Sequence, residues 1–226
     1  MKLYIVSTPI GNLKDITLRA IETLKEVDFI LCEDTRTSGN LLTHYDIKKE
    51  LISLNAFNEK NKIDFIVNRI LSNQTAALIS DAGTPLISDP GVRLVSLCIE
   101  NGIEIIPIPG PSALIAAISM SGLPTDAFVF EGFLPQKKGR KTKLKELANE
   151  PRTIVLYESM YRIEKLLNEL NEFIPDRFVV VCREITKKFE ESWRGFPKEL
   201  VETFGNKIVK GEFVVVISPK DWKQKF

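Results

Sequence analysis

Short apolar runs and segments with helical spacing alternate along the first half of the chain. The runs have the length and composition of buried strands and lie at residues 3–6, 29–32, 51–54, 76–79 and 103–108. Between them, apolar residues recur every three or four positions, as on the buried face of a helix. Helices are expected after a cap at Asp15 and over residues 63–71, 92–100 and 112–120. This alternation predicts an α/β fold with a mainly parallel sheet.

After Gly122 the pattern changes. Strands with alternating or β-branched character are expected at residues 128–133, 154–157, 178–182 and 213–217, and helices at 161–170 and 198–204. Hairpins can form between such closely spaced strands, so the second sheet is expected to be mixed. We therefore predict two α/β domains, residues 1–113 and 114–226.

Composition excludes several classes of protein. Apolar residues make up 44% of the chain and charged residues 27%, as in ordinary soluble proteins. No apolar run approaches the roughly 18 residues of a membrane helix. The N-terminal segment MKLYIVSTPIGN is too short for a secretory signal and is expected to form the first strand. A cytoplasmic protein without a membrane segment is expected.

Cysteine and histidine usage argues against a metal site. Cys32, Cys98 and Cys182 lie in separate apolar segments with no CxxC spacing, so neither a disulfide framework nor a zinc knuckle is expected. The single histidine, His44, excludes a multi-histidine metal site and lies in a polar stretch typical of the surface. We expect no metal.

Charge is distributed unevenly along the chain. The net charge is +1 overall, but −3 over residues 1–113 and +4 over residues 114–226. An anionic partner, if there is one, is therefore expected to contact the second half.

Three loops combine small residues with proline, and each follows an expected strand. They occupy residues 7–12, 80–85 and 107–112. Glycine allows close backbone approach and proline stiffens a loop, so less entropy is lost on binding. Any one of them is an ordinary turn on its own, but three on one sheet edge indicate a small-molecule site. The chain has neither GxGxxG after its first strand nor GxxxxGK[ST], so a dinucleotide enzyme or a P-loop nucleotidase is poorly supported.

Several strings in these and later segments identify a family. VSTPIGNLKDITLRA, CEDTRTSGNLL, ALISDAGTPLISDPG and PIPGPSALIAA, followed by EGFLPQKKGRK, VLYES, REITKKFEE and KGEFVVVI, resemble the tetrapyrrole methylase superfamily in order over nearly the whole chain. Within it, the chain looks like the bacterial branch that methylates a cytidine 2′-hydroxyl in the decoding centre of 16S ribosomal RNA. The resemblance implies two α/β domains, S-adenosylmethionine in a cleft between them, and a homodimer.

The resemblance also implies which residues contact the cofactor. The loop after the fourth strand would border it, the segment opening the helix at residue 112 would contact it from the opposite side, and two residues of the second domain would close over the adenine and ribose. With the first loop included, the expected contacts are Pro9, Gly11, Gly83, Thr84, Pro85, Ile87, Ser112, Ala113, Tyr157 and Gly211.

Three residues after the second strand are candidates for the chemistry. Transfer of a methyl group from a sulfonium is an in-line displacement, and a ribose hydroxyl is a poor nucleophile that must lose its proton. Asp34 or Glu33 is expected to accept that proton, while Arg36 holds an RNA phosphate. The alternative is that Asp34 and Arg36 simply pair with each other.

Basic residues of the second half are candidates for RNA binding. They are Lys137, Lys138, Arg140 and Lys141, extended by Lys187 and Lys188, with Phe189 available for base stacking. The alternative is a solvated helix face. The expected partner is 16S rRNA, either free or within the 30S subunit.

Two features depart from the family pattern. Many members carry an additional basic module after the last strand, whereas this chain stops at Phe226, so RNA is expected to be held by the core domains, a dimer partner or the subunit itself. Met160 and Tyr161 replace an expected Pro-His pair.

Two other functions stay open at this point. One is methylation of a tetrapyrrole or other small-molecule precursor, although the Ala82-Gly83-Thr84-Pro85 loop differs from the Gly-Asp-Pro usual in those branches. The other is a non-catalytic RNA-binding assembly factor, which is disfavoured because every expected cofactor loop is intact.

Overall fold

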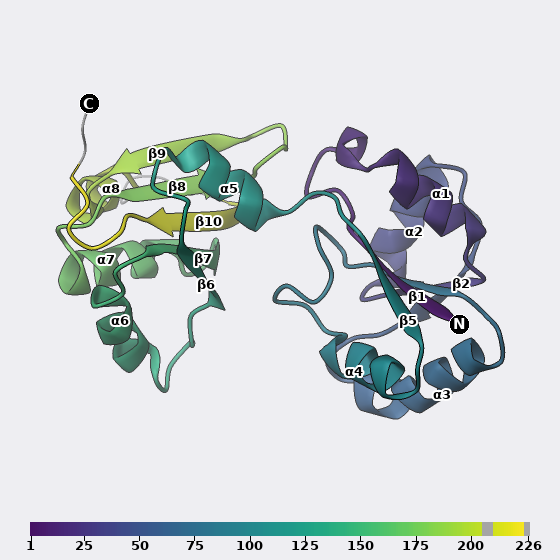
Figure 1. Ribbon diagram of the computed structural model, residues 1–226. Helices are drawn as coiled ribbons and strands as arrows, with labels where there is room; N and C mark the ends of the chain where they lie inside the picture. The colour runs from purple at the N-terminus through teal and green to yellow at the C-terminus, as the bar shows by residue number, and fades with distance from the viewer. Residues whose placement is uncertain (205–209, 224–226) are drawn as a thin grey trace. The chain divides into compact units, whose positions relative to one another are not determined.

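The computed structural model describes residues 1–204 and 210–223. Its Cα atoms group into two compact units, Met1–Ser112 and Ala113–Phe226, each with its own sheet and core (Figure 1). Among the described residues, no helix is both long and apolar enough to cross a membrane.

The first unit contains a parallel sheet of order β3-β2-β4-β1-β5, so the prediction of a mainly parallel sheet is confirmed. Its strands are β1 (Lys2–Val6), β2 (Phe29–Cys32), β3 (Glu50–Ser53), β4 (Ala76–Leu78) and β5 (Glu104–Ile108). Its helices are α1 (Leu18–Glu26), α2 (Thr35–His44), α3 (Glu59–Leu71) and α4 (Val92–Glu100), with a short 3₁₀ helix at Leu13–Asp15.

Both faces of this sheet are covered, which explains its continuous apolar strands. Successive strand residues enter opposite cores: Leu31 packs in the cluster that holds α3 and α4, and Cys32 in the cluster that holds α1 and α2. Figure 1 shows the two helix pairs on opposite sides of the sheet. All three cysteines of the chain are buried free thiols.

Two expectations for the first unit need correction. Thr17, rather than Asp15, caps α1: its Oγ1 accepts a hydrogen bond from Ala20 N at 3.1 Å, whereas Asp15 ends the 3₁₀ helix. Helix α2 was not expected, because its ten residues place only Ser38 and Leu42 in the core. His44, at its end, is exposed as expected.

The second unit contains a mixed sheet of order β6-β7-β10-β8-β9, as predicted. Strand β6 runs parallel to β7, and all other neighbours are antiparallel. The strands are β6 (Phe128–Phe133), β7 (Thr153–Ser159), β8 (Val179–Arg183), β9 (Glu191–Gly195) and β10 (Glu212–Ile217). The helices are α5 (Ala113–Ser121), α6 (Arg140–Ala148), α7 (Ile163–Phe173) and α8 (Pro197–Phe204).

One core cluster lies between this sheet and helices α6, α7 and α8, and α5 contacts β10. Strand β9 and helix α6 were not expected. Strand β9 is a polar edge strand, and α6 coincides with the basic run. Because β6, β7 and β8 run in the same direction, all three end at one edge of the sheet, and β9 and β10 begin at that edge.

Candidate functional site

The three glycine- and proline-containing loops of the first unit contact one another, as predicted. Thr8 N donates to Gly83 O at 2.9 Å and Gly83 N donates to Thr8 O at 3.0 Å, forming a small bridge between the loops after β1 and β4. The Oγ of Ser7 lies 3.1 Å from the Oγ1 of Thr84, and Thr84 Oγ1 donates to Pro111 O at 3.2 Å. We call this arrangement the three-loop cradle (residues 7–12, 80–91 and 109–112).

The cradle lies at the topological switch point of the sheet. After β1 the chain passes through α1 to β2 on one side, and after the neighbouring β4 it passes through α4 to β5 on the other side. In open α/β sheets, the crevice at the carboxyl ends of two such strands is where ligands bind. The bridge between Thr8 and Gly83 joins the loops of these two strands.

Close packing explains the small residues in the cradle. A Cβ on Gly83, whose φ is +84°, would lie 3.3 Å from Ile10 Cγ2, and one on Gly110 would lie 3.0 Å from Ser7 Cβ. The loop after β4 also holds two non-glycine residues in the left-handed region, Leu86 at φ +74° and Ser88 at φ +67°. Such conformations cost energy and concentrate at ligand-binding segments.

The predicted cofactor contacts of the first unit lie on this cradle. Pro9 and Pro85 are buried and stiffen their loops, while Gly11 is exposed. The side chain of Ile87 is 40% exposed, so it presents an apolar surface to solvent. Ser112 ends the third loop directly before α5, of which Ala113 is the first residue.

Acidic side chains gather at the same sheet edge. Asp34 N donates to Asp81 Oδ1 at 3.2 Å. Burial, reinforced by neighbouring carboxylates, raises the pKa of Glu33, and burial raises that of Asp81. Burial and the nearby Glu33 charge raise the pKa of Asp89 to about 6. Asp89 is therefore the carboxylate here whose pKa best suits proton transfer near neutral pH.

Asp34 and Arg36 pair with each other, as the alternative interpretation held. The Arg36 guanidinium holds the pKa of the Asp34 carboxyl down to about 2, which makes Asp34 a weak base. The hypothesis that Asp34 accepts the proton is therefore not favoured by this geometry. Asp89 was missed by the sequence reasoning, although the second aspartate of SDAGTPLISDPG was the available signal.

In the second unit, Tyr157 anchors an aromatic group at the end of β7. Its hydroxyl accepts a hydrogen bond from Leu114 N at 3.2 Å. Its ring contacts Phe130 and Phe133 edge-on, with centroids 4.9 and 5.8 Å apart. The phenol thus fixes the first turn of α5 against the sheet.

The predicted contact Gly211 has a local structural explanation. Its φ is +127°, and a Cβ there would lie 2.6 Å from Cγ of Glu184. Glu184 Oε1 accepts from Glu212 N at 3.0 Å, so glycine allows this carboxylate to pack against the chain. Cofactor contact by Gly211 stays a prediction.

The basic run divides into exposed and buried members. Lys137, Lys138 and Lys141 are exposed, and no carboxylate of the described residues lies within ion-pair distance of them. Arg140 is only 3% exposed: its Nε bonds to Glu169 at 2.7 Å, and Nη2 faces Glu158 at 3.6 Å. The guanidinium of Arg140 is therefore inside the protein, so Lys137, Lys138 and Lys141 are the better candidates for RNA binding.

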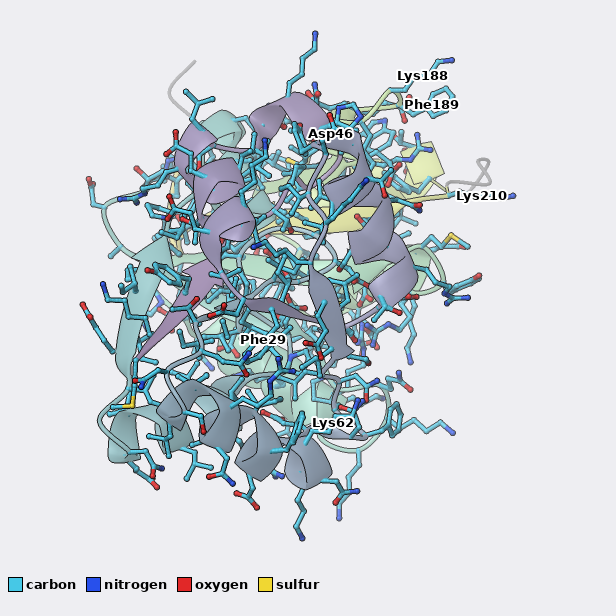
Figure 2. All side chains as sticks on the ribbon, turned by 90° about the vertical axis from the view of Figure 1, so that its right-hand side faces the viewer. Phe29, Asp46, Lys62, Lys188, Phe189 and Lys210 are labelled. Carbon is cyan, nitrogen blue, oxygen red and sulfur yellow. The ribbon has the colours of Figure 1, made fainter. Side chains whose placement is uncertain are left out.

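The two lysines after β8 also differ. Lys187 is ion-paired with Glu184 at 3.0 Å and Glu212 at 2.8 Å, which raises its pKa and neutralises its charge. Lys188 is exposed, with Nζ 5.6 Å from the ring centre of Phe189. Figure 2 shows Lys188 and Phe189 projecting away from the ribbon. Lys188 is thus the better candidate for a phosphate contact.

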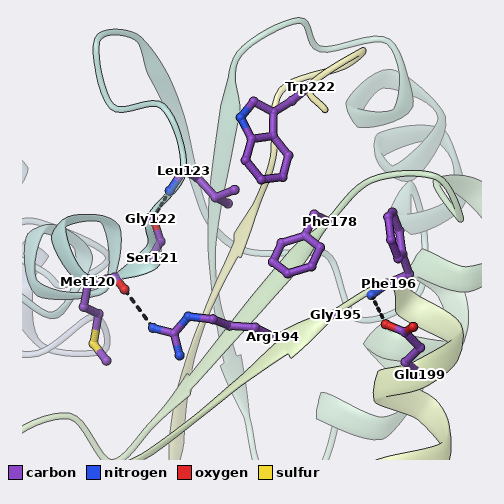
Figure 3. Close-up of a pocket in the computed structure, with 10 residues that line it drawn as sticks. All are labelled: Met120, Ser121, Gly122, Leu123, Phe178, Arg194, Gly195, Phe196, Glu199 and Trp222. Carbon is purple, nitrogen blue, oxygen red and sulfur yellow. Dashed lines mark hydrogen bonds between the residues drawn. The ribbon is translucent and has the colours of Figure 1, made fainter. Parts of the chain in front are cut away.

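A pocket lies at the opposite edge of the second sheet, away from these residues. It has a volume of about 600 Å³ and is lined by Phe178, Phe196 and Trp222 together with Arg194 (Figure 3). The Arg194 guanidinium donates to Met120 O at 2.8 Å and to Ser192 Oγ at 2.7 Å. No predicted site residue lines this pocket. Among the described residues, no group of three or more potential ligands is arranged to hold a metal.

Known protein sequences provide a direct comparison. Residues 2–201 match the family model described as tetrapyrrole (corrin/porphyrin) methylases. The chain is 49% identical over 220 residues to ribosomal RNA small subunit methyltransferase I of Thermotoga maritima, covering 97% of this chain and 99% of that protein. It is 48% identical over 222 residues to the protein of the same name from Haemophilus influenzae, covering 96% of this chain and 78% of that protein.

Solved structures share the fold. Uroporphyrin-III C-methyl transferase of Thermus thermophilus, complexed with S-adenosyl homocysteine, superposes with a TM-score of 0.68 at 19% identity, covering 96% of this chain and 97% of that one. A cobalt precorrin-4 methyltransferase superposes with a TM-score of 0.72 at 20% identity, covering 96% and 94%.

Proposed function

This chain belongs to the tetrapyrrole methylase family, within its branch of ribosomal RNA small subunit methyltransferases, and we propose that it transfers a methyl group from S-adenosylmethionine to a cytidine 2′-hydroxyl of 16S rRNA in the decoding centre. The observation that carries the proposal is the three-loop cradle at the switch point, in a chain 49% identical to a named rRNA methyltransferase. The protein is expected to act in the cytoplasm, as a homodimer, on the small subunit.

The cradle suits this methyl donor. Its glycines leave room for close backbone approach by a nucleoside. The carboxylates of Glu33 and Asp81 at the same edge complement a positive charge such as a sulfonium. Bound there, S-adenosylmethionine supplies an activated methyl group on a good leaving group.

Residues of this chain must then prepare the acceptor. Asp89 is the candidate that takes the proton from the ribose hydroxyl, with Glu33 next to it as the second candidate. The remaining N–H groups of Arg36, whose side chain is 88% exposed, are available to an RNA phosphate. Lys137, Lys138, Lys141 and Lys188 would hold the RNA backbone of the same substrate.

A labelled-methyl assay tests the proposal. The pure protein is incubated with radiolabelled S-adenosylmethionine and, separately, with small ribosomal subunits, naked 16S rRNA and a tetrapyrrole precursor. Label in a single rRNA nucleotide, resistant to alkaline cleavage after nuclease mapping, is expected. Label in the tetrapyrrole alone would assign the chain to small-molecule methylation. If the protein binds the cofactor but transfers no methyl group to any of these substrates, it is a non-catalytic assembly factor.

A further inference from the structure

Three exposed aromatic rings lie at the edge of the second sheet where β6, β7 and β8 end. Phe133 ends β6 and is 51% exposed, Tyr161 follows β7 and is 85% exposed, and Phe189 follows β8 and is 61% exposed. Large apolar side chains are costly to expose to water, so three at one edge indicate a binding surface. Together with Lys137, Lys138 and Lys141 we call this the aromatic edge.

A β-bulge turns Phe133 outward. Phe130 pairs with Val155 and Gly132 with Leu156, so Glu131 is an extra residue in β6. Without it, Phe130 and Phe133 would point to opposite faces, because side chains alternate along a strand. With it, both rings contact Tyr157, and Gly132 adopts the required φ of +58°. The bulge therefore places Phe133 beside Tyr157.

Cations accompany these rings. The guanidinium of Arg162, which is ion-paired with Glu158 at 2.8 Å, lies 5.7 Å from the ring centre of Phe133. The exposed Lys188 has its Nζ 5.6 Å from the ring centre of Phe189. The exposed lysines of the basic run follow β6 at the same edge. Rings interleaved with cations are what a single-stranded nucleic acid requires, since bases stack on rings while phosphates contact cations.

We propose that Phe133, Tyr161 and Phe189 stack on unpaired bases that flank the methylated nucleotide. This rests on the proposed rRNA substrate and adds to it that the recognised segment is single-stranded. Strands β7 and β8 are separated by β10, so the ends of these two strands are about 10 Å apart along the edge. A few unpaired nucleotides span that distance, whereas bases inside a duplex already stack on each other and expose no face.

The test measures binding of fluorescein-labelled RNA to the full chain and its variants. The probes are a mixed-sequence single-stranded 12-mer, about the site size of such surfaces, and the same strand in a duplex. Tyr161→Ala and Phe189→Ala are expected to weaken single-strand binding about fivefold or more each. The slope of log affinity against log salt stays unchanged, because every lysine that neutralises a phosphate is retained. Tyr161→Phe, which keeps the ring, is expected to bind as the wild type does.

Phe196→Ala provides the matched control. Phe196 is 41% exposed and lies in the same unit, but in the pocket at the opposite edge of the sheet (Figure 3). Its replacement is expected to leave RNA affinity unchanged.

Three outcomes would overturn the proposal: wild-type affinity in both ring-deletion variants, an equal loss in Phe196→Ala, or equally tight binding of the duplex by the wild type. Calorimetric titration with S-adenosylmethionine reports separately on the proposed function. If the ring variants bind RNA normally while cofactor binding and methylation persist, the stacking proposal fails and the proposed function stands.

Discussion

Arg36 donates three hydrogen bonds to the carboxylate of Asp34. Its backbone N and Nε reach Oδ1 at 2.8 and 3.2 Å, and Nη2 reaches Oδ2 at 2.8 Å. Asp34 is also the N-cap of α2, so the pair fixes the first turn of that helix at the end of β2. Because the Asp34 carboxylate already accepts these hydrogen bonds, Asp89 and Glu33 are the better candidates for the proton acceptor.

Replacing Asp89 by Asn is expected to reduce the rate of methyl transfer at least about 100-fold, because it removes the base. S-adenosylmethionine affinity, measured by calorimetry, is expected to change little. Asp34→Asn is the matched control and should retain most of the activity. If Asp89→Asn turns over at a near-normal rate and Glu33→Gln does not, Glu33 rather than Asp89 is the base.

The raised pKa of Asp89 also predicts a pH dependence of activity. A base with a pKa of about 6 is deprotonated above that pH, so kcat/KM is expected to fall as pH drops below about 6. The measurement is a pH–rate profile of the wild type between pH 5 and pH 8 with saturating cofactor. A profile that stays flat down to pH 5 would contradict this role.

Asp89 should also make the folding stability depend on pH, but in the opposite direction: stability falls, whereas activity rises, as the pH increases through about 6. The pKa of Asp89 is higher in the folded than in the unfolded state, so its stabilising contribution is complete below about pH 4 and is lost as pH rises through about 6. Asp89→Asn is therefore expected to be more stable than the wild type at pH 8, by roughly 1 kcal/mol once solvent screening is allowed for, and equally stable at pH 4. Urea denaturation at the two pH values measures the difference.

Arg140→Ala is expected to destabilise the second unit by about 3 kcal/mol. It removes the cation nearest to Glu169, at 2.7 Å, and leaves the buried Glu158 with Arg162 as its ion-pair partner. Lys141→Ala, on the same helix but exposed, should change stability by less than about 0.5 kcal/mol. Urea unfolding followed by circular dichroism distinguishes them. Equal stability of the two variants would show that the buried pair contributes nothing.

Changing Lys137, Lys138 and Lys141 to Glu is expected to weaken binding to small ribosomal subunits and to lower the salt slope by about 0.7 for each phosphate that is no longer neutralised. Cofactor affinity should not change. The matched control changes Lys198, Lys220 and Lys223, exposed residues at the opposite edge, to Glu. Because the net charge change is the same, equal losses in both triple variants would indicate nonspecific attraction.

Gly83→Ala is expected to weaken S-adenosylmethionine binding at least about tenfold, since a Cβ at φ +84° both strains the backbone and approaches Ile10. Gly102→Ala separates the two effects: φ is +71° there, but nothing lies within 4 Å of the new atom. The control should lose about 1 kcal/mol of stability and keep full cofactor affinity. Calorimetry with both variants checks the prediction.

Sequence patterns predicted those elements that carry a continuous apolar run or amphipathic spacing. The apolar runs of β2 and β6 and the amphipathic spacing of α4 were sufficient. Helix α2 and strand β9 were not predicted, because the helix buries few side chains and the strand is a polar edge strand. For such elements, tertiary contacts outweigh the local pattern.

The site was predictable where glycine and proline restrict the backbone, and less so where charges pair. The three loops had to meet because parallel strands end at one edge. The burial of Arg140 depends on Glu158 and Glu169, which lie 18 and 29 residues further along the chain, and no local pattern shows that they approach it. The raised pKa of Asp89 likewise depends on its burial in the folded loop.

The bridge between Thr8 and Gly83 joins residues 75 positions apart. Nothing in either segment alone can form it, so the binding surface comes into existence only after two distant strands have found each other. Assembly of such nonlocal sheets is slow, and a molecule that binds only the finished arrangement raises the melting temperature of the entire unit. A thermal-shift screen of nucleosides would therefore reveal ligands of this protein before any reaction has been assayed.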